Sequence, residues 1–385
     1  MAIPHIYLIA GEPSGDIIGA RLINSIQSKT NNKCFISGVG GKEMEKLGFK
    51  SLFPMSEITV MGLAEVIPSL PNLFMRIRQT IADITKKNPC IVVTIDAPDF
   101  SFRILKKISK SEIPLVHYVA PSVWAWKPGR AKKIAQFLNK LLTLFPFEPP
   151  YFEKEGLNTV FVGHPIVESK AGMGEGVIFR KKHNIPRSAK VLSILPGSRV
   201  GEIKRLLPII MNVISSLDHK NLFIILPTLD NLVDHIKNLL KRWNISIIVT
   251  TTIEEKYAAL AASDVAIAAS GTVSLELAMA RVPNVSIYKF NSITAFIGRR
   301  LVKTKFSNLV NILLDKEVVP ELIQEKCNSD LILNEIKKLL DNPEISELQL
   351  KNFDIAIKQL TNNSAKPSDK AANIILNTIK SYDSK

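Results

Sequence analysis

Hydrophobic residues form two series of short, uninterrupted runs along the chain, separated by stretches with the i, i+3, i+4 spacing of helices. The first series comprises residues 5–10, 91–95, 114–119 and 140–145. The second comprises residues 190–195, 222–226, 245–249, 264–268 and 284–287. Wholly apolar strands that alternate with helices are typical of parallel sheets covered on both faces. The pattern therefore predicts an α/β protein with two such sheets.

The boundary between the two series falls at residues 168–189, where the sequence AGMGEG precedes a basic run. Glycine-rich, polar sequence at such a point is typical of an interdomain linker. Beyond residue 329 the strand pattern stops and only helical patterns follow. We therefore predict two Rossmann-like domains facing a cleft, residues 1–168 and 169–328, followed by a helical tail, residues 329–385.

Composition narrows the class of protein. With 46% hydrophobic and 22% charged residues, the chain is not disordered. The net charge of +15 favours nucleic acid, phosphorylated small molecules or acidic lipid as partners, although a solvated basic surface explains it equally well.

The three cysteines are isolated, which argues against a disulfide framework and for a reducing compartment. No run approaches the ~18 apolar residues of a transmembrane helix, and the N-terminus resembles a buried strand more than a signal peptide. We expect a cytoplasmic protein.

The loop after the first strand reads AGEPSGD and holds the first candidate chemistry. Ligands in open parallel sheets bind beyond the carboxyl ends of the strands. Gly11 would let the backbone approach a ligand, and Ser14 is placed to cap the following helix. Glu12 is an unusual carboxylate for a strand end, whereas a tight turn with a capping serine is the structural alternative. The loop is not GxGxxG, which disfavours a nicotinamide site.

The loop IDAPDF carries two further carboxylates, Asp96 and Asp99. Asp99 has a structural explanation, because it is placed to be the N-cap of the next helix. Asp96 has no such explanation and stands directly at the end of a buried strand. We therefore predict that Asp96 faces the cleft as a functional group.

The loop HYVAPSVWAWKPGR holds two of the three tryptophans, Trp124 and Trp126, together with Ser122 and two cations. Aromatic faces beside cations suit stacking on a sugar and neutralising a phosphate. The alternative is a loop that packs its aromatic side chains into the domain interface. His117 lies inside a strand and is expected to be a hydrogen-bonded core histidine. His164, in VGHP, either reaches the cleft or caps a turn.

Two strand ends of the second series carry small and hydroxyl residues followed by charged ones. They are Gly197, Ser198 and Arg199 after the first strand, and Ser270, Gly271, Thr272 and Glu276 after the fourth. Free N–H groups at a helix N-terminus, combined with an arginine, suit a diphosphate. A carboxylate one turn into a helix suits ribose hydroxyls. These residues predict a nucleotide-diphosphate pocket rather than two unrelated turns.

Seven motifs occur here in the order and spacing of the lipid-A-disaccharide synthase family, which the chain resembles from residue 5 to about residue 325. They are AGEPSGD, IDAPDF, PSVWAW, LFPFE, VGHP, LPGSR and SGTVSLE. The resemblance implies a GT-B fold and an inverting, metal-independent glycosyl transfer without a cofactor. The substrates would be UDP-2,3-diacylglucosamine and 2,3-diacylglucosamine 1-phosphate (lipid X), and the products the β-1,6-linked lipid A disaccharide 1-phosphate and UDP.

The resemblance also implies roles for individual residues. Asp96 would be the base, Glu12 would lie in the acceptor-side loop, and Arg199 would bind the UDP diphosphate. Asn311 is the fourth candidate, but the family usually has Leu-Pro-Asn where this chain reads Asn-Leu-Val-Asn. Either Asn311 or Asn308 therefore occupies the functional position.

Residues 60–81 combine an apolar face at helical spacing with Arg76 and Arg78. Pro68 and Pro71 are expected to break the stretch into two short helices. Such a face suits an anionic membrane surface or acyl chains, although a core-facing helix has the same pattern. Resemblance to a family with lipid substrates favours peripheral association with the inner membrane, and makes a homodimer plausible.

Two other classes of function compete with this interpretation. The UDP-N-acetylglucosamine 2-epimerases use the same two-domain architecture, but leave the apolar stretch without a purpose. A nucleic-acid-binding protein is suggested only by the net charge, and would show affinity that falls steeply with salt. We predict no nucleic-acid partner.

Overall fold

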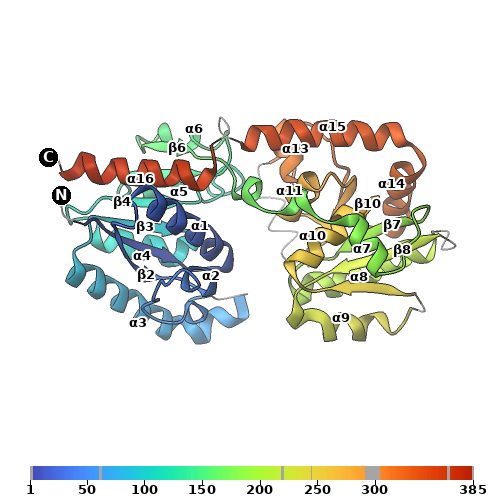
Figure 1. Ribbon diagram of the computed structural model, residues 1–385, viewed down its shortest axis with the longest axis horizontal. Helices are drawn as coiled ribbons and strands as arrows, with labels where there is room; N and C mark the ends of the chain where they lie inside the picture. Colours follow the sequence, from blue (N-terminus) through green and yellow to red (C-terminus); the bar gives the residue numbers. More distant parts are fainter. Residues whose placement is uncertain are drawn as a thin grey trace. The chain divides into compact units, whose positions relative to one another are not determined.

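The computed structural model describes residues 3–59, 63–217, 221–243, 245–290, 304–361 and 365–383 (Figure 1). The chain divides into two compact units. Unit 1 comprises Met1–Pro165 and Leu360–Lys385, and unit 2 comprises Ile166–Gln359. Each unit contains a six-stranded sheet, and all its paired strands run parallel, which confirms the α/β prediction.

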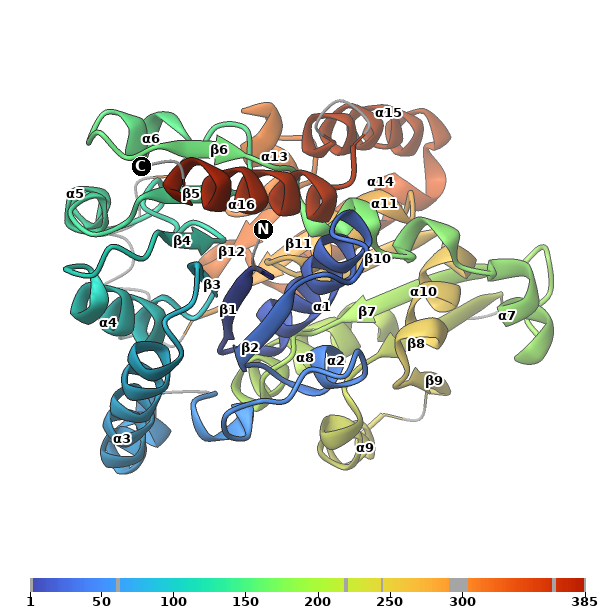
Figure 2. The same cartoon turned by 60° about the vertical axis from the view of Figure 1, so that its left-hand side comes forward.

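The sheet of unit 1 has the strand order β2-β1-β3-β4-β5-β6. The strands are β1 (His5–Ala10), β2 (Phe35–Val39), β3 (Ile91–Ile95), β4 (Leu115–Tyr118), β5 (Lys140–Thr143) and β6 (Thr159–Phe161). The helices are α1 (Pro13–Lys29), α2 (Lys42–Glu45), α3 (Leu63–Lys87), α4 (Pro98–Ile108), α5 (Arg130–Ala135), α6 (Pro150–Glu153) and α16 (Pro367–Asp383). Because β1 lies between β2 and β3, the order reverses there, as Figure 2 shows.

The sheet of unit 2 has the order β12-β11-β10-β7-β8-β9, which reverses between β7 and β10. The strands are β7 (Lys190–Leu195), β8 (Leu222–Pro227), β9 (Ile247–Thr250), β10 (Val265–Ala269), β11 (Asn284–Tyr288) and β12 (Glu321–Ile323). The helices are α7 (Gly176–Lys182), α8 (Val200–Ser215), α9 (Val233–Leu240), α10 (Ile253–Ala262), α11 (Val273–Met279), α13 (Leu309–Leu314), α14 (Ser329–Asp341) and α15 (Pro343–Leu360).

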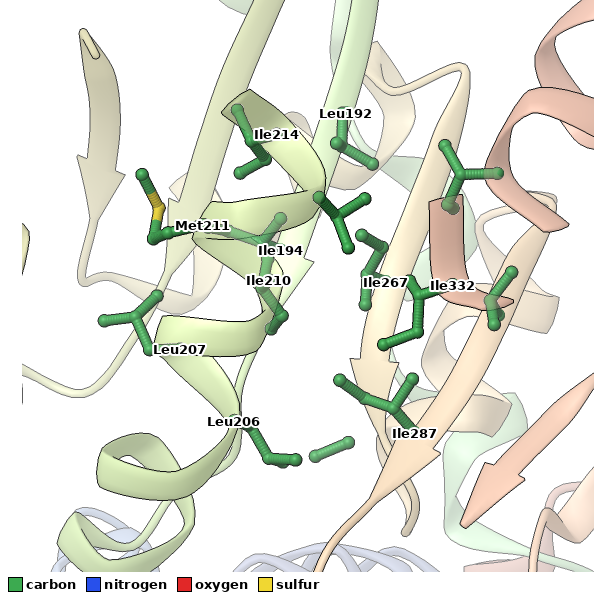
Figure 3. Packing of buried hydrophobic residues seen from close by; sticks show 14 of the residues in the cluster. Leu192, Ile194, Leu206, Leu207, Ile210, Met211, Ile214, Ile267, Ile287 and Ile332 are labelled. Atoms are coloured by element: carbon green, nitrogen blue, oxygen red, sulfur yellow. The ribbon is translucent and has the colours of Figure 1, made fainter. Parts of the chain in front are cut away.

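Helix α8 shows how the apolar pattern builds the core of unit 2. Its buried residues recur every three or four positions, so that one face packs on β7 and β10. Leu206 and Ile210 lie on the side of α8 that faces the strand residue Ile267, and all three belong to one buried cluster with Leu192 and Ile194 (Figure 3). Burial of each such side chain contributes about 1.5–3 kcal/mol relative to leaving it exposed.

Three strands were not predicted: β2, β6 and β12. β2 and β12 are edge strands in their sheets, and β6 and β12 are three residues long. In β2 the apolar run is interrupted by Ser37 and Gly38. Gly38 is required there, because a Cβ would lie 1.9 Å from the carbonyl oxygen of Leu8 on the neighbouring strand. The interruption that hides the strand in the sequence is thus a consequence of strand packing.

The structure divides the predicted helical tail between the two units. α14 and α15 fall in unit 2, while α16 lies in unit 1 beside α1 (Figures 1 and 2). Ser25 on α1 donates a 2.6 Å hydrogen bond to Asp369 on α16. Residues 329–385 are therefore not a separate segment.

The glycine-rich stretch 168–189 is part of unit 2 instead of a linker. α7 packs on α10, and the glycines make this possible. A Cβ on Gly174 would lie 2.0 Å from the carbonyl oxygen of Tyr257, and one on Gly176 2.3 Å from that of Ala261.

Helix α3 also differs from the prediction. It is one element of 25 residues that contains both Pro68 and Pro71. A proline removes its own backbone donor and strains the preceding turn, but it does not exclude helix on both sides. Buried Ile77 and Ile84 hold the second half of α3 on the core of unit 1. Residues 60–62 lie outside the described residues.

Candidate active site

Four of the predicted functional loops lie at the two points where the strand order reverses. In unit 1 the loops after β1 and β3 meet, and in unit 2 the loops after β7 and β10 meet. Such reversal points are where open α/β sheets bind their ligands, because neighbouring crossovers leave to opposite faces and open a crevice. Both candidate sites are therefore in the place that the topology favours.

Asp96 lies at the reversal point of unit 1 in a strained backbone. Asp96 has φ +54° and Ala97 has φ +45°, values that non-glycine residues adopt at a cost. The side chain accepts hydrogen bonds from Ser14 Oγ at 3.0 Å and from the Ala97 backbone N–H at 2.9 Å. Ser101 Oγ donates to the Asp96 carbonyl oxygen at 2.9 Å. These contacts hold a half-buried carboxylate at the strand end in one orientation.

The glycines of the AGEPSGD loop serve chain packing instead of ligand approach. A Cβ on Gly11 would lie 2.6 Å from that of Ala97, and one on Gly15 would lie 3.0 Å from the Ile95 carbonyl oxygen. The loop thus lies directly against the segment that contains Asp96. This close packing is what brings Ser14 within hydrogen-bond distance of Asp96.

Two predicted helix caps are wrong. α1 begins at Pro13 with the exposed Glu12 at its N-cap, so Ser14 lies within the first turn and bonds Asp96 instead. α4 begins at Pro98, which places Asp99 inside the helix without a capping bond. The Asp99 side chain is 91% exposed and pairs with Arg130 at 3.1 Å. In both loops a proline at the first helical position places the N-cap two residues earlier than predicted, at Glu12 and at Ala97.

The tryptophan loop places its two indoles differently. Trp124 is half-buried, donates to Glu148 at 3.3 Å and meets the ring of Phe147 edge-on. Trp126 is 42% exposed with the Lys127 ammonium 4.3 Å from its ring centroid. Ser122 is exposed, and its carbonyl accepts from the backbone of Ala125 and Trp126. Trp126 is therefore the indole available for stacking on a ligand.

The two histidines near these loops are held neutral by their surroundings. His117 is buried, shares a 2.6 Å hydrogen bond with Thr94, and burial lowers its pKa to about 3. The prediction of a core histidine is confirmed. His164 packs on Phe145, and burial together with Arg21 lowers its pKa to about 3.

A pocket of about 470 Å³ in unit 2 brings together the seven residues predicted for the nucleotide site. They are Gly197, Ser198, Arg199, Ser270, Gly271, Thr272 and Glu276. Arg199 is the N-cap residue of α8, and its side chain is 74% exposed and 3.5 Å from Glu202. Glu202 also accepts from the Ser198 backbone at 3.2 Å and from Tyr288 at 2.9 Å. The Glu202 carboxylate therefore fixes the loop that presents Arg199 to the pocket.

The opposite wall of the pocket is formed by the loop after β10 and by α11. Gly271 has φ +152°, and a Cβ there would meet no atom within 4 Å, so this backbone is open to a ligand. Ser270 Oγ donates to the Ser307 carbonyl oxygen at 3.1 Å, and Thr272 is exposed. Glu276 forms a 2.5 Å ion pair with Lys256 on α10.

Five polar lining residues were not predicted: Thr228, Thr251, Thr252, Lys256 and Glu202. The first three follow β8 and β9, so hydroxyl residues at the ends of two predicted strands were a usable signal. Lys256 lies within α10, and nothing in its local sequence distinguishes it from a solvated lysine. Only the packing of α10 beside α11 pairs it with Glu276.

Asn311 has a different place from the one the resemblance implies. It is buried and uses its whole amide: Nδ2 donates to Val319 and Glu321, and Oδ1 accepts from the backbones of Val318 and Val319. Asn308 is also buried and caps α13, accepting from the Val310 backbone at 2.9 Å. Both asparagines therefore shape the segment that leads into β12.

Two parallel-sheet units, with a pocket lined by glycine, hydroxyl and charged residues at the reversal point of the second, define a protein of the GT-B fold. Solved structures agree on the fold. A UDP-GlcNAc 2-epimerase from Neisseria meningitidis aligns with a TM-score of 0.65 and 14% identity, over 98% of this chain and 100% of its own. MurG from Acinetobacter baumannii aligns with a TM-score of 0.58 and 14% identity, over 97% and 99%.

Sequence comparison gives the family. The model described as lipid-A-disaccharide synthetase matches residues 6–375. A lipid-A-disaccharide synthase from Rhodospirillum centenum is 43% identical, over 97% of this chain and 94% of its own. One from Paramagnetospirillum magneticum is 42% identical over 97% of both chains. The chain belongs to the lipid-A-disaccharide synthetase family.

Proposed function

We propose that this protein joins UDP-2,3-diacylglucosamine to 2,3-diacylglucosamine 1-phosphate and releases UDP. The product is the β-1,6-linked lipid A disaccharide 1-phosphate, formed with inversion at the anomeric carbon. The single observation that carries the proposal is the family match over residues 6–375. The pocket of unit 2 supports it, because its groups suit a nucleoside diphosphate.

The donor would bind in the pocket of unit 2. The Arg199 guanidinium and the backbone N–H groups at the start of α8 suit the diphosphate, whose charge grows as the glycosidic bond breaks. The open backbone at Gly271 lets a phosphate or sugar approach closely. Glu276 suits the ribose hydroxyls, with Lys256 fixing its orientation.

The acceptor would be activated in unit 1. The 6-hydroxyl oxygen attacks the anomeric carbon, the bond to UDP breaks, and a base takes the hydroxyl proton. We assign this base to Asp96, because Ser14 and the Ala97 backbone fix its carboxylate at the strand end. Glu12, exposed at the N-cap of α1 in the adjoining loop, is the rival.

The epimerase alternative rests on fold alone. The epimerase from Neisseria meningitidis is 14% identical, whereas the synthases named above reach 42–43%. An epimerase would also leave the exposed apolar residues of α3 without a role.

We also propose that α3 docks unit 1 on an anionic membrane surface. Phe74 and Met75 are 48% and 51% exposed, Arg78 is exposed, and the Arg103 guanidinium lies 5.4 Å from the Phe74 ring centroid. Leu73, by contrast, packs on the core. None of the described helices is long and apolar enough to cross a membrane. This surface would place the enzyme at the cytoplasmic face of the inner membrane.

A homodimer is proposed through α15. Its exposed Ile345, Leu348 and Ile355 lie on one helix, and an apolar stripe of this kind suits a second copy. Sedimentation of the Leu348→Glu variant against the unaltered protein tests this, with a shift to monomer as the expected result.

The decisive experiment is mass spectrometry of the products formed from both diacylated sugars by the purified protein. A disaccharide 1-phosphate together with stoichiometric UDP is expected. UDP-sugar turnover without any disaccharide would reject the proposed function.

A further inference from the structure

Glu148 is a buried carboxylate that takes no part in the glycosyl transfer proposed for this protein. It is 3% exposed and lies in the turn between β5 and α6. A buried charge persists in a protein only where hydrogen bonds or a counter-charge offset its lost hydration. Its partners therefore show what it does.

Three donors from two loops converge on this carboxylate. Oε2 accepts from the backbone N–H groups of Leu144 and Phe145, both at 3.0 Å. Oε1 accepts from the indole of Trp124 at 3.3 Å. The first two donors belong to the loop after β5, and the third belongs to the loop after β4. Glu148 thus ties together two neighbouring strand ends on the edge that also carries Asp96.

The loop that Glu148 holds is strained and leads to exposed polar and aromatic groups. Val119, a β-branched residue, has φ +80° at the end of β4, a conformation that surrounding contacts must impose. Beyond Trp124 the chain presents the exposed Trp126. A row of rings continues from Trp124 through Phe147 and Phe145 to His164. Loss of the bond between Trp124 and Glu148 would therefore release this loop at its centre.

We propose that Glu148 is a positioning residue that holds the loop 121–126 in the conformation that receives the acceptor sugar. It acts through Trp124 and does not touch substrate, because it is buried and its oxygens already accept from three donors. This assignment rests on the proposed function for the identity of the acceptor.

The ionisation of Glu148 gives this role a measurable signature. Burial raises the pKa of Glu148 to about 7, while its three donors oppose the rise. A proton on Oε1 would weaken the hydrogen bond from the Trp124 indole, whereas Oε2 would keep its two backbone donors. Acidification through pH 7 should therefore loosen the tryptophan loop.

Other titratable groups around Glu148 would not produce a pH-dependent change near pH 7. His117 and His164, whose pKa values burial lowers to about 3, stay neutral from pH 5 to 8. The charged side chains on the elements packed around it are half-buried or exposed and do not bond Glu148: Arg130, Lys132, Lys133, Lys140, Glu153, Lys154 and Glu155.

The test is a pH titration of the indole N–H resonances in the full-length protein, which has three tryptophans. The Trp124 resonance, assigned with Trp124→Phe, should move with a midpoint near pH 7 and be insensitive to pH in Glu148→Gln. Trp243, which lies outside this loop, is the internal control. Glu153→Gln, which removes an exposed carboxylate on α6, should leave the titration unchanged.

Steady-state kinetics completes the test. Glu148→Gln should raise the acceptor KM roughly tenfold, as expected for a lost hydrogen bond to a charged group, with donor KM unchanged. In Glu148→Gln, the fall of kcat/KM for the acceptor below pH 7 should also disappear.

If Glu148→Gln does not fold, Trp124→Phe removes the same bond and should raise the acceptor KM to a similar extent. An unchanged acceptor KM in a folded variant, or no titration of Trp124, overturns the proposal. If the unaltered protein forms no disaccharide, the proposed function fails, while the indole titration still reports on the positioning role.

Discussion

The two reversal points use similar residues for different physical purposes. In unit 1, Gly11 and Gly15 lie against Ala97 and Ile95, so their missing side chains are filled by another segment of the same chain. In unit 2, Gly271 lies beside open space. A glycine next to a serine at a strand end therefore indicates close approach, but does not say whether the neighbour is the protein or a ligand.

The carboxylates of the two regions differ in the same way. In the unit 2 pocket each carboxylate that lines the wall pairs with a cation, Glu202 with Arg199 and Glu276 with Lys256. In unit 1 Asp96 is bound by a hydroxyl and a backbone N–H. A cation-rich wall suits a leaving diphosphate, whereas a carboxylate held by neutral donors suits the proton transfer that we propose for Asp96. The comparison supports the proposal that unit 1 carries the proton transfer and unit 2 binds the charge of the diphosphate.

The largest effect is expected at Asp96. Asp96→Asn keeps the size and most hydrogen bonding but cannot take a proton, so kcat should fall by ~10²–10⁴ with UDP affinity unchanged. Asp99→Asn, which alters only an exposed ion pair with Arg130, is the matched control and should cost little. Kinetics at fixed pH with both substrates saturating measures this. A much greater loss in Glu12→Gln would move the base to Glu12.

Arg199 should come next. Arg199→Ala removes the cation from the developing diphosphate charge and should lower turnover by ~10²–10³. Arg199→Lys should restore part of it, because the bidentate fork is lost while the charge remains. Wild-type turnover in Arg199→Ala would place the diphosphate elsewhere and would remove the distinction between the two regions.

The glycines give a direct test of the comparison. Gly11→Ala and Gly271→Ala should each lower the free energy of unfolding by about 1–3 kcal/mol, the first by overpacking and the second by backbone strain. Only Gly271→Ala should weaken UDP binding, by roughly tenfold, because only its Cβ would enter the pocket. Calorimetry of unfolding and of UDP binding distinguishes the two. Weakened UDP binding in Gly11→Ala would contradict the assignment.

The smallest effect concerns the membrane surface of unit 1. Replacing Phe74 and Met75 by serine should weaken binding to vesicles that contain anionic lipid, while thermal stability and UDP affinity stay unchanged. Leu73→Ser is the control, because Leu73 packs on the core and its loss should lower stability. Vesicle sedimentation in parallel with thermal unfolding measures both. Equal vesicle binding by the double variant and the unaltered protein would reject docking through α3.

Most of the sheet architecture was predictable from the sequence, because apolar runs and helical spacing are local patterns that burial imposes directly. Nine strands and the seven pocket residues of unit 2 follow from where those runs end. Asp96 could be singled out for the same reason, since a carboxylate at the end of a buried strand is visible in the sequence.

Only the tertiary structure decided what each loop residue contacts. It paired Lys256 with Glu276, placed α16 on α1, gave Asn311 a structural task, and showed that Gly174 and Gly176 pack on α10. It also joined Trp124 to Glu148 across two loops. These contacts link residues distant along the chain, and their energies depend on geometry that no local pattern records. The sequence by itself determined nine of the twelve described strands and where they end, because burial of a whole strand imposes an uninterrupted apolar run. Packing determined whether the groups at those ends meet one another or stay open to a ligand.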